Sequence, residues 1–292
     1  MHGPPMSGLD PSATDGIALA PAPGAAGLGV AAPRAVLSLL PLFLHRWQTM
    51  PEAGGVPAVR CEQEKDGLAV IAPVLPGGRY LAAGPLQAAD VVASALAVLA
   101  VQGAGVILPH AAALESPAGL VLLLADTTGG KSTLALTLAA VGWRLFGDDR
   151  LGLCRERDGS TGIALGLAPK LRLPLPHSAA ALAKFAAART RRDWPNLAYL
   201  ELRPEEQAAA GVQAPVAACL LLDRSGGAPA LEPATPPQLV GPLAESAAAP
   251  WLAPAEVLAA AVSHAGLPAF RLHYGEATEA VPLLLERFGG PS

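Results

Sequence analysis

The stretch of residues 119–153 constrains the fold of this chain more than any other part of its sequence. An apolar run at residues 120–124 leads into a turn rich in Gly and Thr, and Lys131-Ser132-Thr133 and an Ala/Leu-rich helical pattern follow. A strand, a loop and a helix in this order are typical of a phosphate-binding loop, whose backbone N–H groups face phosphate oxygens at the helix N-terminus. The sequence therefore predicts a nucleotide-phosphate site within an α/β fold.

The loop departs from the usual pattern G-x-x-x-x-G-K-[ST] at its entrance, where Ala125 stands in place of the first glycine. Alanine is tolerated there if its φ is negative, and Gly129 offers a flexible position nearby. We expect Lys131 to reach the β- and γ-phosphates and Ser132 to bind Mg²⁺. The alternative is a Gly-Thr turn between a core strand and a core helix, with Lys131 solvated. The nucleotide-binding residues expected from this loop are Thr127, Thr128, Gly129, Gly130, Lys131, Ser132 and Thr133.

An aspartate pair, Asp148-Asp149, follows the next apolar stretch at residues 143–146. A hydroxyl attacks a phosphoryl group well only when its proton has an acceptor, and a carboxylate is the usual one. Neighbouring side chains at a strand end point to opposite sides, so one aspartate can face Mg²⁺ and the other the hydroxyl. We favour Asp148 as the catalytic base and Asp149 as the metal ligand, with the reverse left open. A solvated turn, or a salt bridge to Arg150 or Arg144, is the competing interpretation.

Three further residues are candidates for the same site. His110 begins a β-like stretch directly before the loop strand, so it is placed to hydrogen-bond an aspartate or a phosphate in a catalytic role, although a structural role is equally open. Lys170 and Arg172 are two residues apart and share a face if they lie on a strand. Two cations on that face can bind transferred phosphate or an acidic substrate, whereas an ordinary solvated strand explains them nearly as well.

Composition limits the classes of partner and the location. A chain of 292 residues, 52% hydrophobic and 15% charged, is long enough for a large α/β domain with a smaller lobe. The net charge of −4 argues against nucleic-acid binding, which needs a basic face. Three cysteines without a C-x-x-C pair give no metal or disulfide framework. No apolar run is long enough to span a membrane, and residues 1–16 lack the basic region of a signal peptide. We expect a cytoplasmic protein without membrane or nucleic-acid partners.

The pattern along the chain predicts three segments. Residues 1–33 form a low-complexity, flexible arm rich in Gly, Ala and Pro; residues 34–85 form a small N-terminal lobe; and residues 86–292 form the catalytic domain. Residues 225–237 read as a loop. Helices are expected at residues 86–101, 179–189, 236–248, 254–265 and 276–288. Strands are expected at residues 59–61, 68–74, 80–81, 106–108, 110–114, 120–124, 143–146, 151–155, 162–167, 197–202, 216–222 and 270–274.

The order of these parts resembles the catalytic domain of the HPr kinase/phosphorylase family, and more closely the HPr-kinase-related proteins of bacterial peptide-modification pathways. The resemblance covers about residues 110–288 and rests on His110-Ala111-Ala112, the loop at residues 125–133, Gly142-Trp143-Arg144-Leu145 and Asp148-Asp149-Arg150-Leu151. It implies a P-loop fold like that of phosphoenolpyruvate carboxykinase, with a mixed sheet flanked by helices. It also implies ATP- and Mg²⁺-dependent phosphorylation of a serine hydroxyl on a protein or ribosomal peptide.

Matched to that family, Lys131 and Ser132 belong to its phosphate loop, Asp148 and Asp149 are its paired aspartates, and His110 is the histidine before the loop strand. Thr133 stands where well-known members carry a glutamate that helps to hold metal. The glycine- and arginine-rich signature associated with phosphorolysis has no counterpart in this sequence, so the resemblance implies kinase chemistry alone.

Two other functions stay open at this point: a kinase for a small hydroxyl-bearing molecule, and a nucleotide-binding regulatory or assembly protein without transferase activity. The acceptor, the choice of ATP over GTP and the formation of a homo-oligomer are not encoded in any motif of the sequence.

Overall fold

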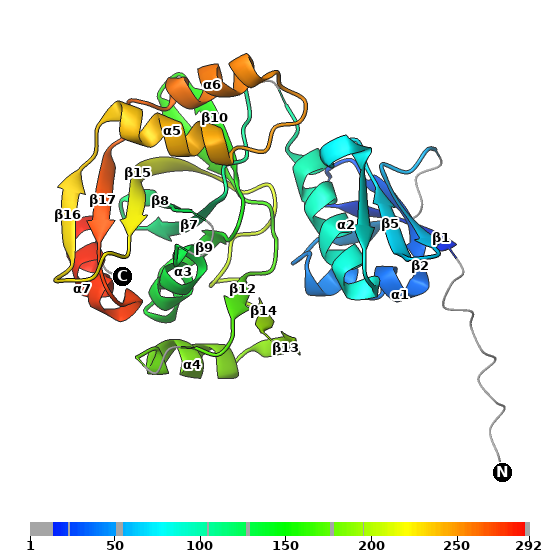
Figure 1. Ribbon diagram of the computed structural model, residues 1–292, viewed down its shortest axis with the longest axis horizontal. Helices are drawn as coiled ribbons and strands as arrows, with labels where there is room; N and C mark the ends of the chain where they lie inside the picture. The colour runs from blue at the N-terminus through cyan, green and yellow to red at the C-terminus, as the bar shows by residue number, and fades with distance from the viewer. Residues whose placement is uncertain are drawn as a thin grey trace, which may run out of the picture.

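Two lobes lie side by side in the computed structural model (Figure 1). It describes residues 14–22, 24–50, 55–103, 105–126, 129–175, 178–194 and 196–289, with the side chains of residues 190–194 outside the description. The first lobe ends with the helix α2, and the larger lobe begins shortly after it.

The N-terminal lobe is a six-stranded sheet in the order β3-β1-β2-β4-β5-β6. Strands β2 and β4 are parallel, and the other neighbours are antiparallel. The strands are β1 (Thr14–Ala20), β2 (Leu28–Pro33), β3 (Gln48–Met50), β4 (Val59–Glu64), β5 (Gly67–Ile71) and β6 (Arg79–Ala82). The helical segments of this lobe are α1 (Arg34–Leu37), η1 (Leu40–Leu42), η2 (Pro76–Gly78) and α2 (Pro85–Ala100).

The long helix α2 belongs to this lobe by packing. Pro85 occupies its first turn, where the missing N–H is no loss. Its buried face, which includes Val92 and Leu96, shares one core with Val59 and Val70 of the sheet. The predicted helix at residues 86–101 is confirmed, but it covers the N-terminal sheet, whereas the sequence placed it at the start of the catalytic domain.

The first strands correct a second expectation. Strands β1 and β2 lie inside residues 1–33, which the sequence predicted to be a flexible arm, and they pair antiparallel from Thr14 opposite Pro33. Strand β1 is fully buried only at its end, at Ala18, Leu19 and Ala20. Small residues with so little alternation give a weak strand signal, which explains the error. Residues 1–13 lie outside the described part of the chain.

The larger lobe is built on an eight-stranded mixed sheet, which confirms the predicted α/β architecture. Its path runs β10-β11-β15-β8-β7-β9, and β17 adds to β15 with β16 beyond it. Strand β8 is parallel to β15, which is parallel to β17 in turn, so all three end at one edge of the sheet. The strands are β7 (Ala111–Ser116), β8 (Gly119–Leu124), β9 (Arg144–Gly147), β10 (Gly152–Glu156), β11 (Gly159–Ile163), β15 (Gln213–Asp223), β16 (Ala230–Pro233) and β17 (Ala269–His273).

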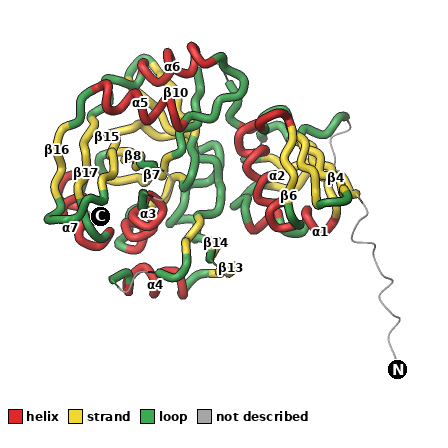
Figure 2. Tube along the Cα trace, viewed as in Figure 1, coloured by secondary structure: helices red, strands yellow, loops and turns green. Residues whose placement is uncertain are grey.

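Helices cover both faces of this sheet, as Figures 1 and 2 show. Strand β8 is apolar on both sides: Val121 and Leu123 join the core under α3 and α7, while Leu120 and Leu122 join the core under α5 and α6. A strand buried on both faces reads as a continuous apolar run, as this one does. The helices of the larger lobe are α3 (Lys131–Ala140), α4 (Ala180–Ala187), α5 (Pro236–Ser246), α6 (Pro254–Ser263) and α7 (Ala277–Phe288).

A small antiparallel sheet in the order β12-β14-β13 completes the lobe, with β12 (Lys170–Arg172), β13 (Thr190–Trp194) and β14 (Leu197–Glu201). One loop expectation fails, because β16 lies within residues 225–237. Strand β13 was also missed, because the sequence pattern predicted no element at residues 190–194. Among the described residues, no helix is both long and apolar enough to cross a membrane.

The two lobes are joined by backbone hydrogen bonds close to the small sheet. The N–H of His45 donates to the carbonyl of Gly166 over 2.7 Å, and the N–H of Ala168 donates to the carbonyl of Phe43 over 2.8 Å. The ring of Phe43 meets that of Tyr199 edge to face, with centroids 4.8 Å apart. These contacts bring α2 beside the ends of β9 and β12, where the candidate site lies.

Candidate phosphate-binding and carboxylate site

The predicted loop lies between the end of β8 and the first residue of α3. Gly130 caps the helix with a φ of +87°, a left-handed conformation that favours glycine. A Cβ at Gly130 would also lie 2.8 Å from the hydroxyl of Tyr274 and 2.9 Å from Cδ of Arg224. Glycine is therefore required at this position for two reasons: the positive φ and the lack of room for a Cβ atom. Thr127 and Thr128 lie outside the described residues.

Ala125, at the loop entrance, is compatible with the turn. It is not among the described non-glycine residues with positive φ, which are Arg46 and Asp149. Its methyl group fills the space beside Gly129, where an added Cβ would lie 2.6 Å from Cβ of Ala125. The glycine missing at the entrance is thus matched by a glycine near the exit of the same turn.

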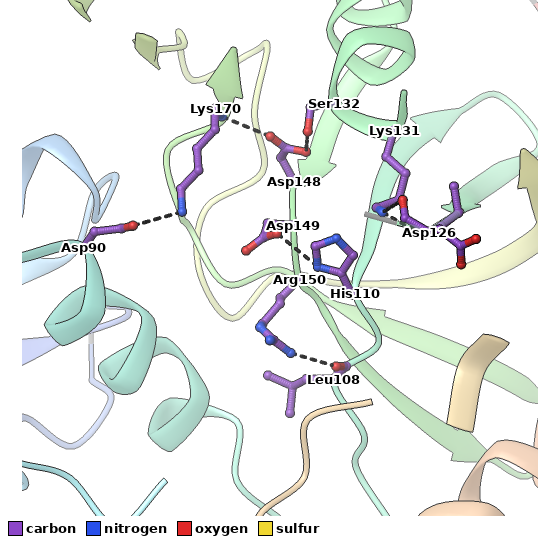
Figure 3. A network of polar contacts seen from close by, with 11 residues as sticks. Asp90, Leu108, His110, Asp126, Lys131, Ser132, Asp148, Asp149, Arg150 and Lys170 are labelled. Atoms are coloured by element: carbon purple, nitrogen blue, oxygen red, sulfur yellow. Dashed lines mark hydrogen bonds and ion pairs between the residues drawn. The ribbon is translucent and has the colours of Figure 1, made fainter. Parts of the chain in front are cut away.

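Lys131 lies in the loop with its side chain buried. Its Nζ donates to the carbonyl of Ala125 over 2.8 Å and to that of Asp126 over 3.2 Å, which folds the ammonium group over the loop (Figure 3). Burial lowers the pKa of Lys131, while the nearby carboxylates of Asp149 and Asp148 oppose this change. A cation held at the centre of a loop at a helix N-terminus is suited to phosphate oxygens.

Asp148 is fully buried immediately after β9. Its Oδ1 accepts a hydrogen bond from the hydroxyl of Ser132 over 2.8 Å, and its Oδ2 accepts one from the backbone N–H of Lys170 over 3.0 Å. Burial raises the pKa of Asp148, and the two hydrogen bonds act in the opposite direction. This carboxylate joins the first turn of α3, the end of β9 and the start of β12.

Asp149 has a different environment. Its φ is +73°, a conformation that asparagine and aspartate adopt more readily than other side chains with a Cβ. Its side chain is 39% exposed, and Nδ1 of His110 lies 3.1 Å from its Oδ1. Burial of the group raises its pKa, but the His110 hydrogen bond and the charges of Lys170, His110 and Arg150 outweigh that effect and lower the pKa to about 2. The two aspartate side chains therefore have different partners.

Lys170 and Arg172 point to the same side of β12 but make different contacts. The Nζ of Lys170 forms an ion pair with Asp90 of α2 at 3.1 Å and lies 5.7 Å from the centre of the Tyr199 ring. Arg172 is exposed, and its charge contributes to the lowered pKa of Lys131. The structure thus places Arg172 near Lys131 and Lys170 near the aspartate pair, with Lys170 held by the N-terminal lobe.

Thr133 contributes its backbone to the helix. It is half-buried, and its carbonyl accepts a hydrogen bond from the hydroxyl of Thr137 over 2.7 Å.

The donor groups at this site fit a magnesium ion that arrives with a nucleotide. Among the described residues, no group of three or more His, Cys, Asp or Glu side chains is placed to hold a metal ion. Mg²⁺ usually takes only one or two protein oxygens beside water and substrate phosphates. The hydroxyl of Ser132 and the carboxylate of Asp148 are such oxygens, next to the predicted phosphate position.

Two residues at the edge of the loop were not singled out from the sequence. Tyr274 is buried, and its hydroxyl has no hydrogen-bond partner among the described residues. Arg224 is partly exposed and donates from Nε and Nη2 to the carbonyl of Gly275, over 3.3 and 3.2 Å. Both directly follow strands that run parallel to β8, and ligands of open α/β sheets bind at this carboxyl edge. That rule was the available signal for finding them.

A cavity of about 440 Å³ lies beside the loop on the α5 side. His110, Asp126, Gln238, Glu245 and Arg271 give it polar walls. It therefore offers both acidic and basic side chains next to the phosphate loop.

No protein-family model and no curated protein matches this chain. Among solved structures, the chain is similar to the Hpr(Ser) kinase/phosphatase from Coxiella burnetii at 15% identity and a TM-score of 0.33. The match covers 62% of this chain and 92% of the other. The assignment of a function therefore depends on the geometry of the site.

Proposed function

We propose that the protein is an ATP- and Mg²⁺-dependent phosphotransferase that phosphorylates a serine hydroxyl on a protein or peptide. One observation carries the proposal: a loop with a buried lysine and a hydroxyl bonded to a buried carboxylate lies next to a second, exposed carboxylate. Phosphoryl transfer requires in-line positioning and neutralisation of the phosphoryl oxygens more than covalent chemistry. The described residues supply groups for both tasks.

The phosphate loop would hold the nucleotide. Its backbone N–H groups and the N-terminus of α3 attract phosphate oxygens, and Lys131 adds a full positive charge. In the structure this ammonium group is bonded to two loop carbonyls, so it needs only to exchange those partners for phosphate oxygens. Arg172 and Arg224, both exposed nearby, add positive charge around the γ-phosphate.

Ser132 and Asp148 would hold the metal ion. When bound there, Mg²⁺ neutralises charge on the phosphate oxygens. The role of Asp148 in this proposal reverses the assignment favoured from the sequence. It is buried, and its oxygens accept hydrogen bonds from Ser132 and from the backbone N–H of Lys170, so it is less accessible to an acceptor hydroxyl than Asp149 is.

Asp149 would meet the acceptor. Its carboxylate is exposed and is held by His110, so it can accept the proton of an incoming hydroxyl while the oxygen is directed at the γ-phosphorus. The new O–P bond forms as the bond from the γ-phosphorus to the β,γ-bridging oxygen breaks, and the electron pair leaves on that oxygen with the nucleoside diphosphate. Because the pKa of Asp149 is low, orientation of the hydroxyl is its main contribution.

The first experiment is a calorimetric titration of Mg·ATP into the wild-type protein, Lys131→Ala and Lys184→Ala. Lys184 is exposed on α4, so the second variant removes the same charge away from the loop. We expect binding by the wild type and the Lys184 variant and none by Lys131→Ala. An absence of wild-type binding in folded protein would overturn the proposal. Binding without phosphate transfer to any serine peptide would favour a kinase for a small molecule or a nucleotide-binding regulator instead.

A further inference from the structure

A cavity of about 820 Å³ opens between the two lobes and takes no part in the site described above. One wall is formed by residues 73–78 and by Ala95 and Val98 of α2, and the other by residues 247–250 together with Leu258 of α6. Both walls are largely apolar. Cavities of this size at a junction between domains are common ligand sites.

Among the described residues that line this cavity, Arg150 alone is charged. Figure 3 shows it extending away from Asp148 and Ser132, towards Leu108. Its Nη1 donates to the carbonyl of Leu108 over 3.4 Å, and its charge helps to lower the pKa of the neighbouring Asp149, but no carboxylate among the described residues forms an ion pair with it. A half-buried guanidinium in apolar surroundings favours an anionic partner, and a carboxylate fits its planar fork. The occupant that complements this cavity is therefore apolar and carries a carboxylate.

The apolar surface continues outside the cavity. Leu258 lies at its edge and is 52% exposed, and Val262, four residues further along α6, is 51% exposed. Residues four apart lie on the same face of a helix, so the two side chains form one apolar stripe leading outwards. A ligand that covers both the cavity and the stripe is longer than the cavity, which favours a chain over a compact small molecule.

The cavity also adjoins the exposed carboxylate of the site. Arg150 directly follows Asp149 in the chain. Ser94 of α2 lines both the cavity and the narrow space beside Asp148 and Asp149. A chain lying in the cavity therefore contacts Arg150, the residue after Asp149, and Ser94, which also lines the narrow space beside Asp149.

We infer that the interlobe cavity binds the acceptor as an extended apolar peptide segment whose acidic side chain pairs with Arg150. The inference rests on the proposed function, because it assigns the substrate class and the binding surface to the same reaction. The peptide places a serine hydroxyl at Asp149, while its apolar side chains cover the cavity wall and the stripe formed by Leu258 and Val262.

The test measures binding of fluorescently labelled peptides without nucleotide, by anisotropy. The probes are short Leu/Ala peptides with one serine and one glutamate at varied spacing, and the same peptides with glutamine in place of glutamate. We expect the wild type to bind the best glutamate peptide about tenfold more tightly than the matching glutamine peptide, which is the contribution of one charge-assisted hydrogen bond. Arg150→Gln should abolish this preference. Leu258→Glu should weaken both peptides, whereas Val56→Glu, which adds the same charge at a 93% exposed residue outside the cavity, should weaken neither.

Two results would overturn the inference: no peptide binds, whether or not decanoate, a small apolar acid, binds in the cavity; or peptide binding is unaffected by Leu258→Glu and Arg150→Gln. A parallel titration of the wild type with Mg·ATP tests the proposed function separately. Peptide binding without nucleotide binding would contradict the proposed phosphotransferase and support the peptide site. Nucleotide binding without peptide binding would support the proposed phosphotransferase and overturn the peptide site.

Discussion

The hydroxyl of Ser132 donates to Oδ1 of Asp148 over 2.8 Å, which ties the first turn of α3 to the end of β9. The other oxygen of the same carboxylate accepts the N–H of Lys170 on β12. One buried side chain therefore fixes three segments around the predicted phosphate position. The neighbouring Asp149 is free of this arrangement and faces His110.

Replacement of Asp148 should act on the nucleotide. In Asp148→Asn the side chain loses its negative charge, and its amide group has one acceptor oxygen for the donors at Ser132 and Lys170. We expect Mg·ATP affinity to fall roughly 10- to 100-fold, as expected when a charge-assisted interaction is lost. Calorimetry at saturating Mg²⁺ measures this change, with far-ultraviolet circular dichroism to verify the fold. Unchanged affinity would place the metal elsewhere.

Replacement of Asp149 should act on the transfer step. Asparagine tolerates the positive φ at this position, so Asp149→Asn keeps the backbone and the size of the side chain. We expect the transfer rate to fall about 10²-fold, the lower end of the range for general acid–base catalysis, because Asp149 acts mainly by orienting the hydroxyl, while Mg·ATP binding stays close to wild type. Single-turnover transfer from labelled ATP to an acceptor peptide gives the rate. If nucleotide affinity falls and the rate does not, the roles of Asp148 and Asp149 are as first favoured from the sequence.

The contact between Ala125 and Gly129 can be tested by a double-mutant cycle. Gly129→Ala brings two methyl groups within 2.6 Å of each other and one within 3.0 Å of the carbonyl of Asp126. We expect destabilisation of about 1–3 kcal/mol from this overpacking, together with weaker nucleotide binding. Adding Ala125→Gly should recover part of both losses, because it removes the methyl contact and leaves the carbonyl contact. Chemical denaturation gives the coupling energy, and strictly additive effects would show that the two residues are not in contact.

The loop was predictable because its residues are close in sequence. The pattern from the apolar strand through Lys131 to the aspartate pair indicates both the secondary structure of the loop and the side chains that act there. The sequence placed His110 within reach of an aspartate but did not indicate which one, and the surroundings of Asp148 depend on the backbone of Lys170, which no motif indicates. Adjacency indicates that two side chains diverge, but it does not indicate which of them becomes buried.

Remote partners were beyond sequence reasoning for the same reason. Asp90 reaches the site because α2 packs on the N-terminal sheet, and its apolar pattern predicted a helix without predicting its neighbours. Tyr274 and Arg224 approach Gly130 only because β8, β15 and β17 are parallel and end at one edge. Parallel pairing joins residues that are distant in sequence, and local periodicity does not record it.

His264 should make the protein less stable in mild acid. It is fully buried with Ser160, whose Oγ lies 2.7 Å from its Nδ1. Burial lowers its pKa from 6.5 to about 4, with a smaller contribution from the charge of Arg155. Below pH 6.5 the imidazole of His264 is protonated in the unfolded chain, but in the folded protein it stays neutral down to about pH 4. The free energy of unfolding therefore decreases as the pH is lowered from 6.5 to about 4.

The loss from this one group is about 3 kcal/mol, and it should be absent in His264→Gln. Urea denaturation of the wild type and the variant at both ends of the interval measures the difference. Buried His45 has a pKa lowered in the same direction, so both proteins should lose some stability. Parallel losses in the two proteins would contradict the assignment to His264.

The ion pair between Asp90 and Lys170 should restrain nucleotide binding more than it stabilises the fold. Both side chains are about one-third exposed, and such pairs contribute only about 0.2–1 kcal/mol to folding. The pair holds the Lys170 ammonium on the N-terminal lobe, so phosphate must compete with Asp90 for it. We therefore expect Asp90→Asn to bind Mg·ATP several-fold more tightly, whereas Asp66→Asn, an exposed change in the same lobe, has no effect. Adding Lys170→Met should remove the gain. Weaker binding by Asp90→Asn would instead show that the pair maintains the site by positioning the lobes.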